Sequence, residues 1–424
     1  MCKIIRSIFI LIIFSPWLFP TPGHTAEYHL GMDVGVSINR HTAYLDRGEL
    51  GLVDQLHFSE DRSSLLMRAD PYCAFTLGEG IGGYLQADMN WENSDDETAD
   101  ESVEVELTNA YLQLSKGPVG ADLGLQTLVM GNGRIMIDDV PAAALRISRG
   151  NRYMQLTLAQ ALGSSPLAAV SVGYRPGAFE DLALFGIWFK DQDDAFAKAI
   201  PLFYQVLLEP ESDGDLYWTG ISADLFAGKA LLSATVAYQW GQFGIHNATA
   251  RTTRQVSAFL ADLSVEGNLT DWCSLGVFFY FASGDDAPLQ DDLNAFVSIM
   301  PFNPRAAVFF DPEFLGRDED DEKLTFGGGY YGGVMAPGLT LNLVSPTGLS
   351  LGATVATFFA HQALDDGSRW YGWEFDLDLS YPFGRFYTLY IEAARFQHGD
   401  YYESLLSEPV DAAVRLTAGL RASF

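Results

Sequence analysis

The last thirteen residues, AAVRLTAGLRASF at positions 412–424, decide the fold class that this sequence predicts. Apolar side chains stand at every second position: Ala412, Val414, Leu416, Ala418, Leu420, Ala422 and Phe424. The positions between them carry small side chains and two arginines, Arg415 and Arg421. A period of two residues places the two sets on opposite faces of an extended strand. The stretch therefore predicts a β-strand that is apolar along one whole face.

The same alternation recurs along the chain. It is clearest in the segments 81–91, 230–240, 259–265, 371–381 and 387–393. Several of these segments run for about ten residues, the length of a tilted membrane strand, whereas strands of soluble proteins peak near five or six. Aromatic residues often end the apolar face, as Trp91 and Trp240 do, and this is typical of the girdles at a membrane–water interface. The pattern favours membrane strands over a soluble β-sandwich, which also alternates.

Strands in a membrane must form a closed sheet, because hydrocarbon offers no hydrogen-bond partner to an open edge. The predicted fold is all-β, a transmembrane antiparallel up-and-down β-barrel that occupies residues 27–424. The strand candidates and the chain length both give 16–18 strands, and we favour 18. A barrel of that size is wide enough for a water-filled lumen, whereas eight strands would be filled by side chains.

The N-terminus has the pattern of a secretory signal peptide. Lys3 and Arg6 precede a short apolar run, and small residues follow it at Thr25 and Ala26. We expect residues 1–26 to be removed, which moves the formal charge from −30 to −32 because the segment holds two basic residues and no acidic one. So acidic a chain is not expected to bind nucleic acid. The predicted location is the outer membrane of a Gram-negative bacterium, with Phe424 read by the barrel-assembly machinery.

A long connection at 283–324 carries both acidic and apolar residues. Its phenylalanines would not be needed in a purely solvated loop, so we expect the loop to fold into the barrel or to cap its mouth. Three of its acidic residues, Asp318, Asp320 and Asp321, are candidate ligands for a structural Ca²⁺ that bridges to lipopolysaccharide phosphates. The alternative is an acidic loop that is simply solvated. No other cofactor is expected.

Five arginines are the candidate contacts for a solute in the lumen. They are Arg134, Arg146, Arg152, Arg415 and Arg421. Rows of arginine in a pore bind carboxylates and favour anionic solutes. The alternative is that each arginine pairs with an acidic residue of a neighbouring strand.

The remaining reactive residues show no enzymatic pattern. The histidines are scattered, without the HExxH or GxSxG spacing of hydrolases, so we expect no enzyme. Cys73 and Cys273 could pair in an exported protein, but their distance cannot be read from the sequence.

Two stretches resemble the alginate-export family of outer-membrane barrels. The first comprises NAYLQL at 109–114 and GLQTLVMGNGRI at 124–135. The second comprises FASGDD at 281–286, DDLNAF at 291–296 and MPF at 300–302. The resemblance implies a monomeric 18-stranded barrel with a charged lumen and an extracellular loop folded inward. By motif match it also implies that Arg134 faces the lumen.

The sequence thus predicts a porin-like channel that passes hydrophilic solutes, with anionic solutes or a polysaccharide as the narrower expectation. The alternative is a plugged barrel that acts as a surface adhesin or an envelope-structural protein through its acidic loops. The expected surroundings are outer-membrane lipid and lipopolysaccharide.

Overall fold

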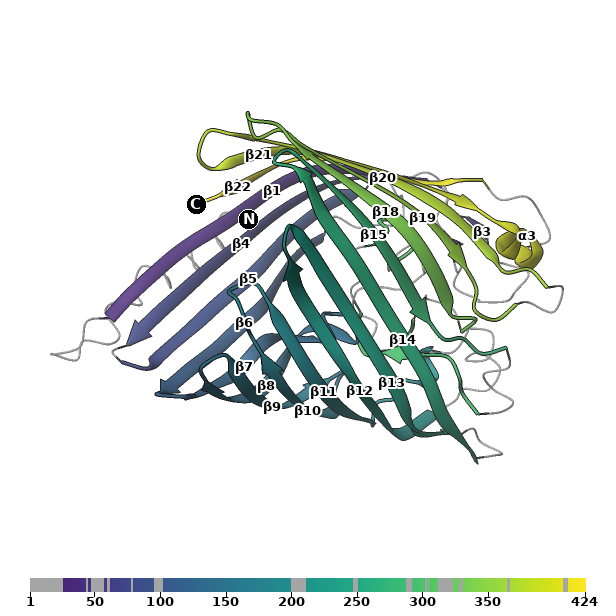
Figure 1. The fold of residues 1–424 in the computed structure, drawn as a ribbon, viewed down its shortest axis with the longest axis horizontal. Helices are drawn as coiled ribbons and strands as arrows, with labels where there is room; N and C mark the ends of the chain where they lie inside the picture. Colours follow the sequence, from purple (N-terminus) through teal and green to yellow (C-terminus); the bar gives the residue numbers. More distant parts are fainter. Residues whose placement is uncertain are drawn as a thin grey trace.

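Eighteen strands form one closed antiparallel barrel in the computed structural model (Figure 1). The structure describes residues 26–42, 45–46, 57–58, 62–77, 79–94, 102–199, 211–246, 251–286, 292–301, 303, 305–311, 323–327, 331–363, 367–406 and 411–424. Most of the predicted signal peptide and the three candidate Ca²⁺ ligands Asp318, Asp320 and Asp321 lie outside the described residues.

Each strand of the barrel pairs with the strands before and after it in the chain. In order around the barrel they are β1 (Ala26–Thr42), β4 (Arg62–Leu77), β5 (Ile81–Ser94), β6 (Ser102–Lys116), β7 (Val119–Met130), β8 (Met136–Arg149), β9 (Arg152–Ala161), β10 (Ser165–Tyr174), β11 (Asp181–Asp191), β12 (Glu211–Ala227), β13 (Ala230–His246), β14 (Arg251–Thr270), β15 (Cys273–Ala282), β18 (Val334–Val344), β19 (Ser350–Phe359), β20 (Trp370–Phe383), β21 (Tyr387–His398) and β22 (Ala413–Ser423). The barrel closes where β1 pairs with β22, from Asp33 opposite Ser423 to Thr42 opposite Val414. The prediction of an up-and-down barrel with 18 strands is confirmed.

The two faces of the strands divide as the alternation predicts. On β22, Leu416 is 44% exposed whereas the next residue, Thr417, is 5% exposed. In a barrel, a large apolar side chain that is exposed faces outward, and here such residues recur on every long strand. A closed barrel with an apolar exterior is the architecture of bacterial outer-membrane proteins. The fold therefore confirms the predicted location in the outer membrane.

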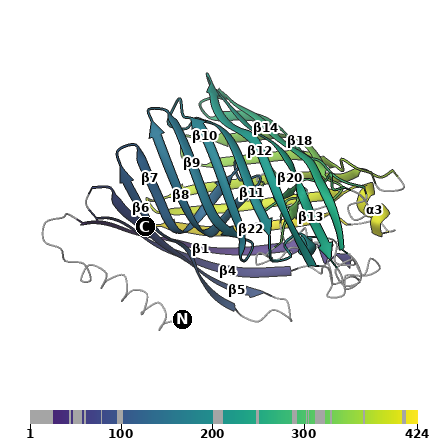
Figure 2. The same ribbon diagram turned by 90° about the horizontal axis from the view of Figure 1, so that it is seen from below.

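Because successive strands run in opposite directions, the connections lie alternately at the two ends of the barrel, and the longest ones are all at one end. The turn between β6 and β7 contains only Gly117 and Pro118, and Gly117 has a φ of 59°, which favours glycine. At the other end lie the short pairs β2 (Leu45–Asp46) with β3 (His57–Phe58) and β16 (Val297–Ser298) with β17 (Thr325–Phe326), the 3₁₀ turn η3 (Ala197–Ala199) and the helix α3 (Asp400–Leu406). Figure 2 shows α3 beyond the strand ends on this side. In the described part of the chain, no helix is long and apolar enough to span a membrane.

Cys73 and Cys273 are both free thiols. They lie on β4 and β15, which are distant from each other around the barrel. The structure therefore settles the question that the sequence left open, and the two residues do not pair.

Candidate solute pathway in the barrel lumen

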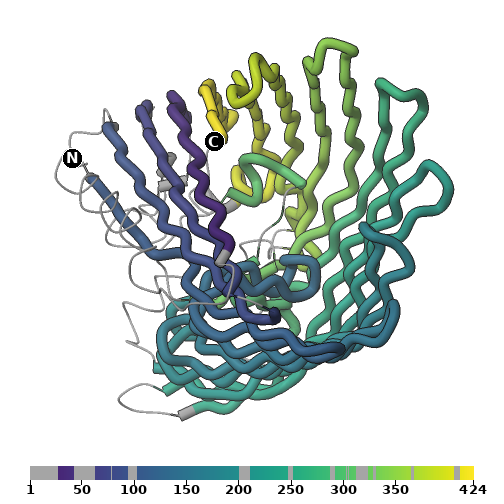
Figure 3. The backbone as a smooth tube through the Cα atoms, turned by 90° about the vertical axis from the view of Figure 1, so that its left-hand side faces the viewer, coloured from purple at the N-terminus to yellow at the C-terminus, as the bar shows by residue number. Residues whose placement is uncertain are grey.

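The described parts of the connection between β15 and β18, which comprises residues 283–333, fold into the lumen (Figure 3). We call its described parts the inward loop. Its residue Phe309 is fully buried and stacks on Phe358 of β19, with ring centroids 4.1 Å apart. Tyr371 and Phe396, from β20 and β21, complete the aromatic cluster. The apolar residues that predicted an inward fold thus bury a large aromatic surface, which is what stabilises this position.

A buried carboxylate anchors the backbone of the inward loop. Glu374 of β20 is 1% exposed and accepts three hydrogen bonds from backbone N–H groups. The donors are Ala307, Val308 and Phe309, at 2.6, 2.7 and 2.8 Å. Hydrogen bonds to an ionised acceptor are stronger than neutral ones, and they satisfy loop N–H groups that are out of reach of water. The loop is therefore fixed to the wall of the lumen at this point.

Arg415 holds the same segment from the neighbouring side of the lumen. Its Nη1 lies 2.7 Å from Asp311 Oδ2 and donates to the carbonyl oxygen of Ala307 at 3.2 Å. The structure places Arg415 in the lumen, where its guanidinium contacts the inward loop. Its side chain is still 32% exposed.

A second structure crosses the lumen from the opposite wall. Residues 126–130 and 136–141, the facing ends of β7 and β8, pair with each other but with neither β6 nor β9, and residues 131–135 form the turn between them. We call this hairpin the arm. Its tip reaches β14, where Arg134 Nε lies 2.5 Å from Asp262 Oδ2. Further along, Ile137 N–H donates to the carbonyl oxygen of Met300 at 2.7 Å, so the arm also joins the inward loop.

One carboxylate receives arginines from both inward-folded structures. Besides Arg134 of the arm, Arg305 of the inward loop approaches Asp262, with Nη2 at 3.2 Å from Oδ1. The Arg305 guanidinium also lies over the ring of Phe278, 5.1 Å from its centroid. Burial lowers the pKa of Arg305 below its usual value, and the charge of Asp262 opposes that shift. We call Arg134, Asp262 and Arg305 the latch, because together they tie arm and loop to β14.

A polar cavity of about 530 Å³ remains beside the arm, toward the turn end of the barrel. Hydroxyl, amide and charged side chains dominate its lining: Asn109, Gln113, Asp122, Gln126, Arg146, Tyr153, Gln155, Thr157, Ser171, Arg175 and Asp181. Arg146 donates to Gln155 Oε1 from Nε at 3.1 Å and from Nη2 at 2.9 Å. In contrast to the latch, Arg146 forms no ion pair with a described residue.

Arg421 faces a second cavity of about 500 Å³ near the turn end. Its guanidinium lies over the ring of Tyr390, 5.3 Å from the centroid. Asp378 and Glu392 contribute to the same lining, so the local charge is mixed.

Comparison with solved structures places this architecture among known barrels. OpdQ of Pseudomonas aeruginosa matches with a TM-score of 0.56 at 11% identity, over 94% of this chain and 99% of its own. OccAB1 of Acinetobacter baumannii matches with a TM-score of 0.56 at 10% identity, over 93% and 97% of the two chains. P. aeruginosa OpdK, solved with vanillate, gives 0.52 at 10% identity, over 93% and 99%.

The fold is that of the outer-membrane porins. No protein-family model and no curated protein matches the sequence. The resemblance to the alginate-export family therefore stays a prediction.

The prediction that Arg152 faces the lumen is wrong. Tyr153, the next residue on β9, is buried and lines the polar cavity beside the arm, whereas Met154 and Leu156 are 45% and 43% exposed on the outer face. The two-residue period places Arg152 with those outward residues, at the start of the strand. The error arose because closeness in sequence to Arg146 says nothing about the face on which the next strand begins.

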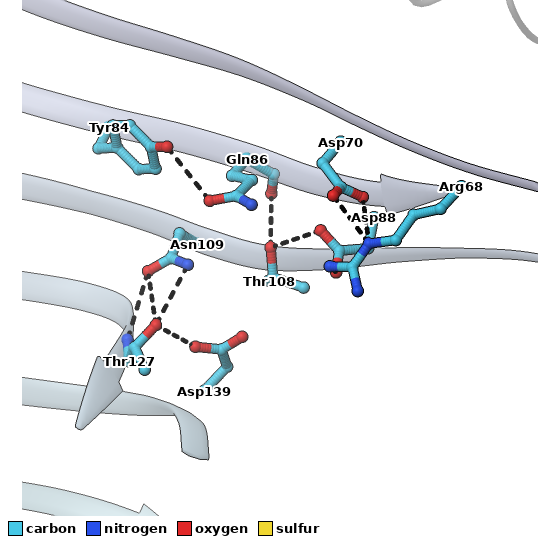
Figure 4. A network of polar contacts seen from close by, with 9 residues as sticks. All are labelled: Arg68, Asp70, Tyr84, Gln86, Asp88, Thr108, Asn109, Thr127 and Asp139. Carbon is cyan, nitrogen blue, oxygen red and sulfur yellow. Dashed lines mark hydrogen bonds and ion pairs between the residues drawn. The ribbon is translucent and has the colours of Figure 1, made fainter. Parts of the chain in front are cut away.

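Arg68 is a lumen residue that the sequence analysis did not single out. Its Nε lies 2.7 Å from Asp70 Oδ2, and its Nη2 lies 2.5 Å from Asp88 Oδ2 on the next strand (Figure 4). The spacing of Arg68 and Asp70 by two residues was the available signal, because it puts both on one face of a strand. The lumen wall therefore carries paired charges on β4 and β5 as well.

Among the described residues, no group of three or more His, Cys, Asp or Glu side chains could hold a metal ion. The expected Ca²⁺ ligands lie outside these residues, so a structural Ca²⁺ stays a prediction.

Proposed function

We propose that the protein is a channel that passes small hydrophilic solutes across the outer membrane. The observation that carries the proposal is the polar lining of the space that remains open in the lumen. The arm and the inward loop cross it, yet a cavity of about 530 Å³ lined mainly by polar groups remains. Cavities of this size suit molecules of metabolite dimensions. The likeness to porins such as OpdQ supports the proposal through the shared fold.

We infer that anionic solutes are favoured among them. Arg146 and Arg421 face these cavities and form no ion pair with a described residue, so their guanidinium groups can bind a carboxylate. Vanillate, which OpdK was solved with, is itself a small carboxylate. Passage of a polysaccharide, which the alginate-export resemblance suggests, fits less well, because the arm spans the lumen and is tied to β14 by Arg134.

Planar-bilayer recording tests the proposal. The mature protein should give discrete conductance steps, and a salt gradient should give a reversal potential that shows anion preference. A plugged barrel acting as an adhesin or envelope-structural protein predicts no steps in any lipid or salt. Lipopolysaccharide as a partner, and the reading of Phe424 by the assembly machinery, remain proposals. Phe424 is 55% exposed on the outer face, where that machinery could reach it.

A further inference from the structure

Three tyrosines form a row on the barrel wall between β1 and the arm. Tyr72 of β4, Tyr84 of β5 and Tyr111 of β6 lie on neighbouring strands. Their ring centroids are 5.9 Å apart at both steps, with angles of 21° and 32° between the ring planes. All three side chains are half-buried, so part of each ring is accessible. We call these residues the tyrosine row.

The tyrosine row faces the lumen. Tyr111 lines the polar cavity beside the arm, and Tyr84 is its direct partner across the two strands. Tyr72 stacks on Tyr84 from the same side of the sheet. The adjacent residues Leu85 and Leu112 are 47% and 49% exposed on the opposite, lipid-facing side. The three rings therefore border the polar space of the lumen, whereas stacked aromatic side chains commonly fill an apolar core.

A glycine lets one end of the row lie close to the wall. Gly31 of β1 is paired directly with Tyr72, and a Cβ at Gly31 would lie 2.2 Å from Tyr72 Cζ. The Tyr72 ring therefore occupies the space that any side chain at position 31 would need. With one side against the backbone of β1, the ring turns its other side to the lumen. The row thus forms a continuous aromatic surface along this part of the wall.

Hydrogen-bonding side chains adjoin this surface (Figure 4). The Tyr84 hydroxyl donates to Gln86 Oε1 at 3.2 Å. Next to it, Arg68 pairs with Asp70 and Asp88, which fixes the positions of all three charged groups. The side-chain amide of Gln86 donates no hydrogen bond to a described residue. This amide is therefore able to bind a solute that rests on the rings.

A carboxylate lies near each end of the row. Asp33 is two residues from Gly31, on the same face of β1. At the other end, Asp122 of β7 lies opposite Gln113, two residues from Tyr111. Neither carboxylate forms an ion pair with a described residue. Because carboxylates repel anions and accept hydrogen bonds from hydroxyl groups, this wall favours solutes that are hydroxylated and not anionic.

A sugar ring has both properties that this wall can recognise. Its C–H groups form an apolar face that packs on aromatic rings, and its hydroxyl groups bond to carboxylate and amide side chains. Aromatic rings and carboxylates also attract organic cations, but sites for such cations surround the charge with several rings. The tyrosine row lies along one wall only. The adjoining cavity of about 530 Å³ has room for a ring-shaped solute of metabolite size.

We propose that the tyrosine row binds the ring of a neutral sugar in the lumen. The apolar face of the sugar would pack on Tyr84 and Tyr111, and its hydroxyl groups would bond to Gln86 and Asp122. The inference rests on the proposed channel function, which brings the solute to this wall. It adds a neutral class of solute to the anionic class that the arginines favour.

Calorimetric titration with maltotriose tests the tyrosine row. The mature protein is kept in a detergent without a sugar head group and should give a saturable heat of binding. Tyr84→Ala should weaken the apparent affinity about tenfold, which corresponds to the loss of one aromatic contact. Tyr84→Phe keeps the ring and should retain most of the affinity. Tyr381→Ala removes a tyrosine from the lipid-facing side of β20 and should bind as the wild type does.

Two further probes separate the classes of ligand. Sorbitol is hydroxylated but has no ring, and choline is an organic cation, so both should bind far more weakly than maltotriose. Binding of either probe as tight as that of maltotriose would overturn the proposal. It would also be overturned by the absence of saturable maltotriose binding in the wild type, or by equal binding in the wild type and Tyr84→Ala.

Folding and conduction are checked independently of sugar binding. Heat-modifiable migration in a gel confirms that each variant is folded, and Tyr111→Ala carries the same expectation if Tyr84→Ala does not fold. Conductance is recorded without sugar. Conductance steps without maltotriose binding would reject the sugar site alone, whereas the absence of steps would reject the channel.

Discussion

Arg134 and Asp262 lie 2.5 Å apart although 128 residues separate them in the chain. Both side chains are less than a tenth exposed. The pair therefore joins the tip of the arm to the wall across the lumen, in a place where neither charge can be hydrated by bulk water. Removing one partner of such a buried pair costs about 3–5 kcal/mol, because the other charge is left uncompensated.

The first prediction concerns this latch. Asp262→Asn leaves Arg134 and Arg305 without their shared carboxylate, so we expect the arm and the inward loop to lose their fixed positions. Single-channel recordings should then show a larger and noisier conductance. Asp213→Asn is the matched control, since Asp213 lies on the outer face of β12 and contacts His246 there. Equal conductance in the wild type and Asp262→Asn would show that the latch does not set the width of the lumen.

The second prediction concerns the anchor of the inward loop. Glu374→Gln removes the charge and leaves one carbonyl oxygen for three N–H donors, whereas each hydrogen bond to a charged group contributes about 1.5–3 kcal/mol. We expect the amides of residues 307–309 to exchange with solvent much faster, as measured by hydrogen exchange with mass spectrometry. Glu392→Gln, on the neighbouring strand β21, should leave their exchange unchanged. Protection retained in Glu374→Gln would mean that the aromatic cluster around Phe309 suffices to hold the loop.

The third prediction concerns charge selectivity. Arg146→Glu and Arg421→Glu each replace a lumen cation by an anion, so the reversal potential in a salt gradient should shift toward cation preference. Arg152→Glu makes the same change in charge on the outer rim and should leave the reversal potential where it is. A shift in Arg152→Glu as large as in Arg146→Glu would contradict the faces assigned to β8 and β9.

Alternation within each strand was enough to predict the wall of the barrel. The two-residue period of β22, and of β20 from Trp373 onward, gave the faces correctly because lipid on one side and water on the other act on every residue of a strand. Tyr371 is an exception: it shares the period of Trp373 but is fully buried in the lumen, beyond a register shift between β19 and β20. The inward fold of the loop was also predictable, since residues such as Phe309 need an apolar partner that a solvated loop lacks.

The latch and the arm could not be predicted in the same way. The sequence at the end of β7 does not differ from that of a strand in the barrel wall. The end of its ladder with β6 depends on the close approach of Gly124 to Ala110, which lies on the neighbouring strand. The pairing of Arg134 with Asp262 is a contact across the lumen, and the two-residue period within a strand gives no information about such contacts. Sequence reasoning therefore placed Arg134 in the lumen but could not show that its charge is already neutralised by Asp262.

The last prediction tests the assignment of faces on which the rest depends. Leu377 and Asp378 are neighbours on β20, and the alternation turns Leu377 to lipid and Asp378 to the cavity near Arg421. In a Cys73→Ser, Cys273→Ser background, Asp378→Cys should react readily with a charged, membrane-impermeant maleimide in intact vesicles. Leu377→Cys should react only after the membrane is dissolved in detergent and the protein is unfolded, because the reagent cannot enter hydrocarbon. Similar reaction rates at the two positions in intact vesicles would mean that the apolar face does not meet lipid, and a water-filled lumen would then have no physical basis.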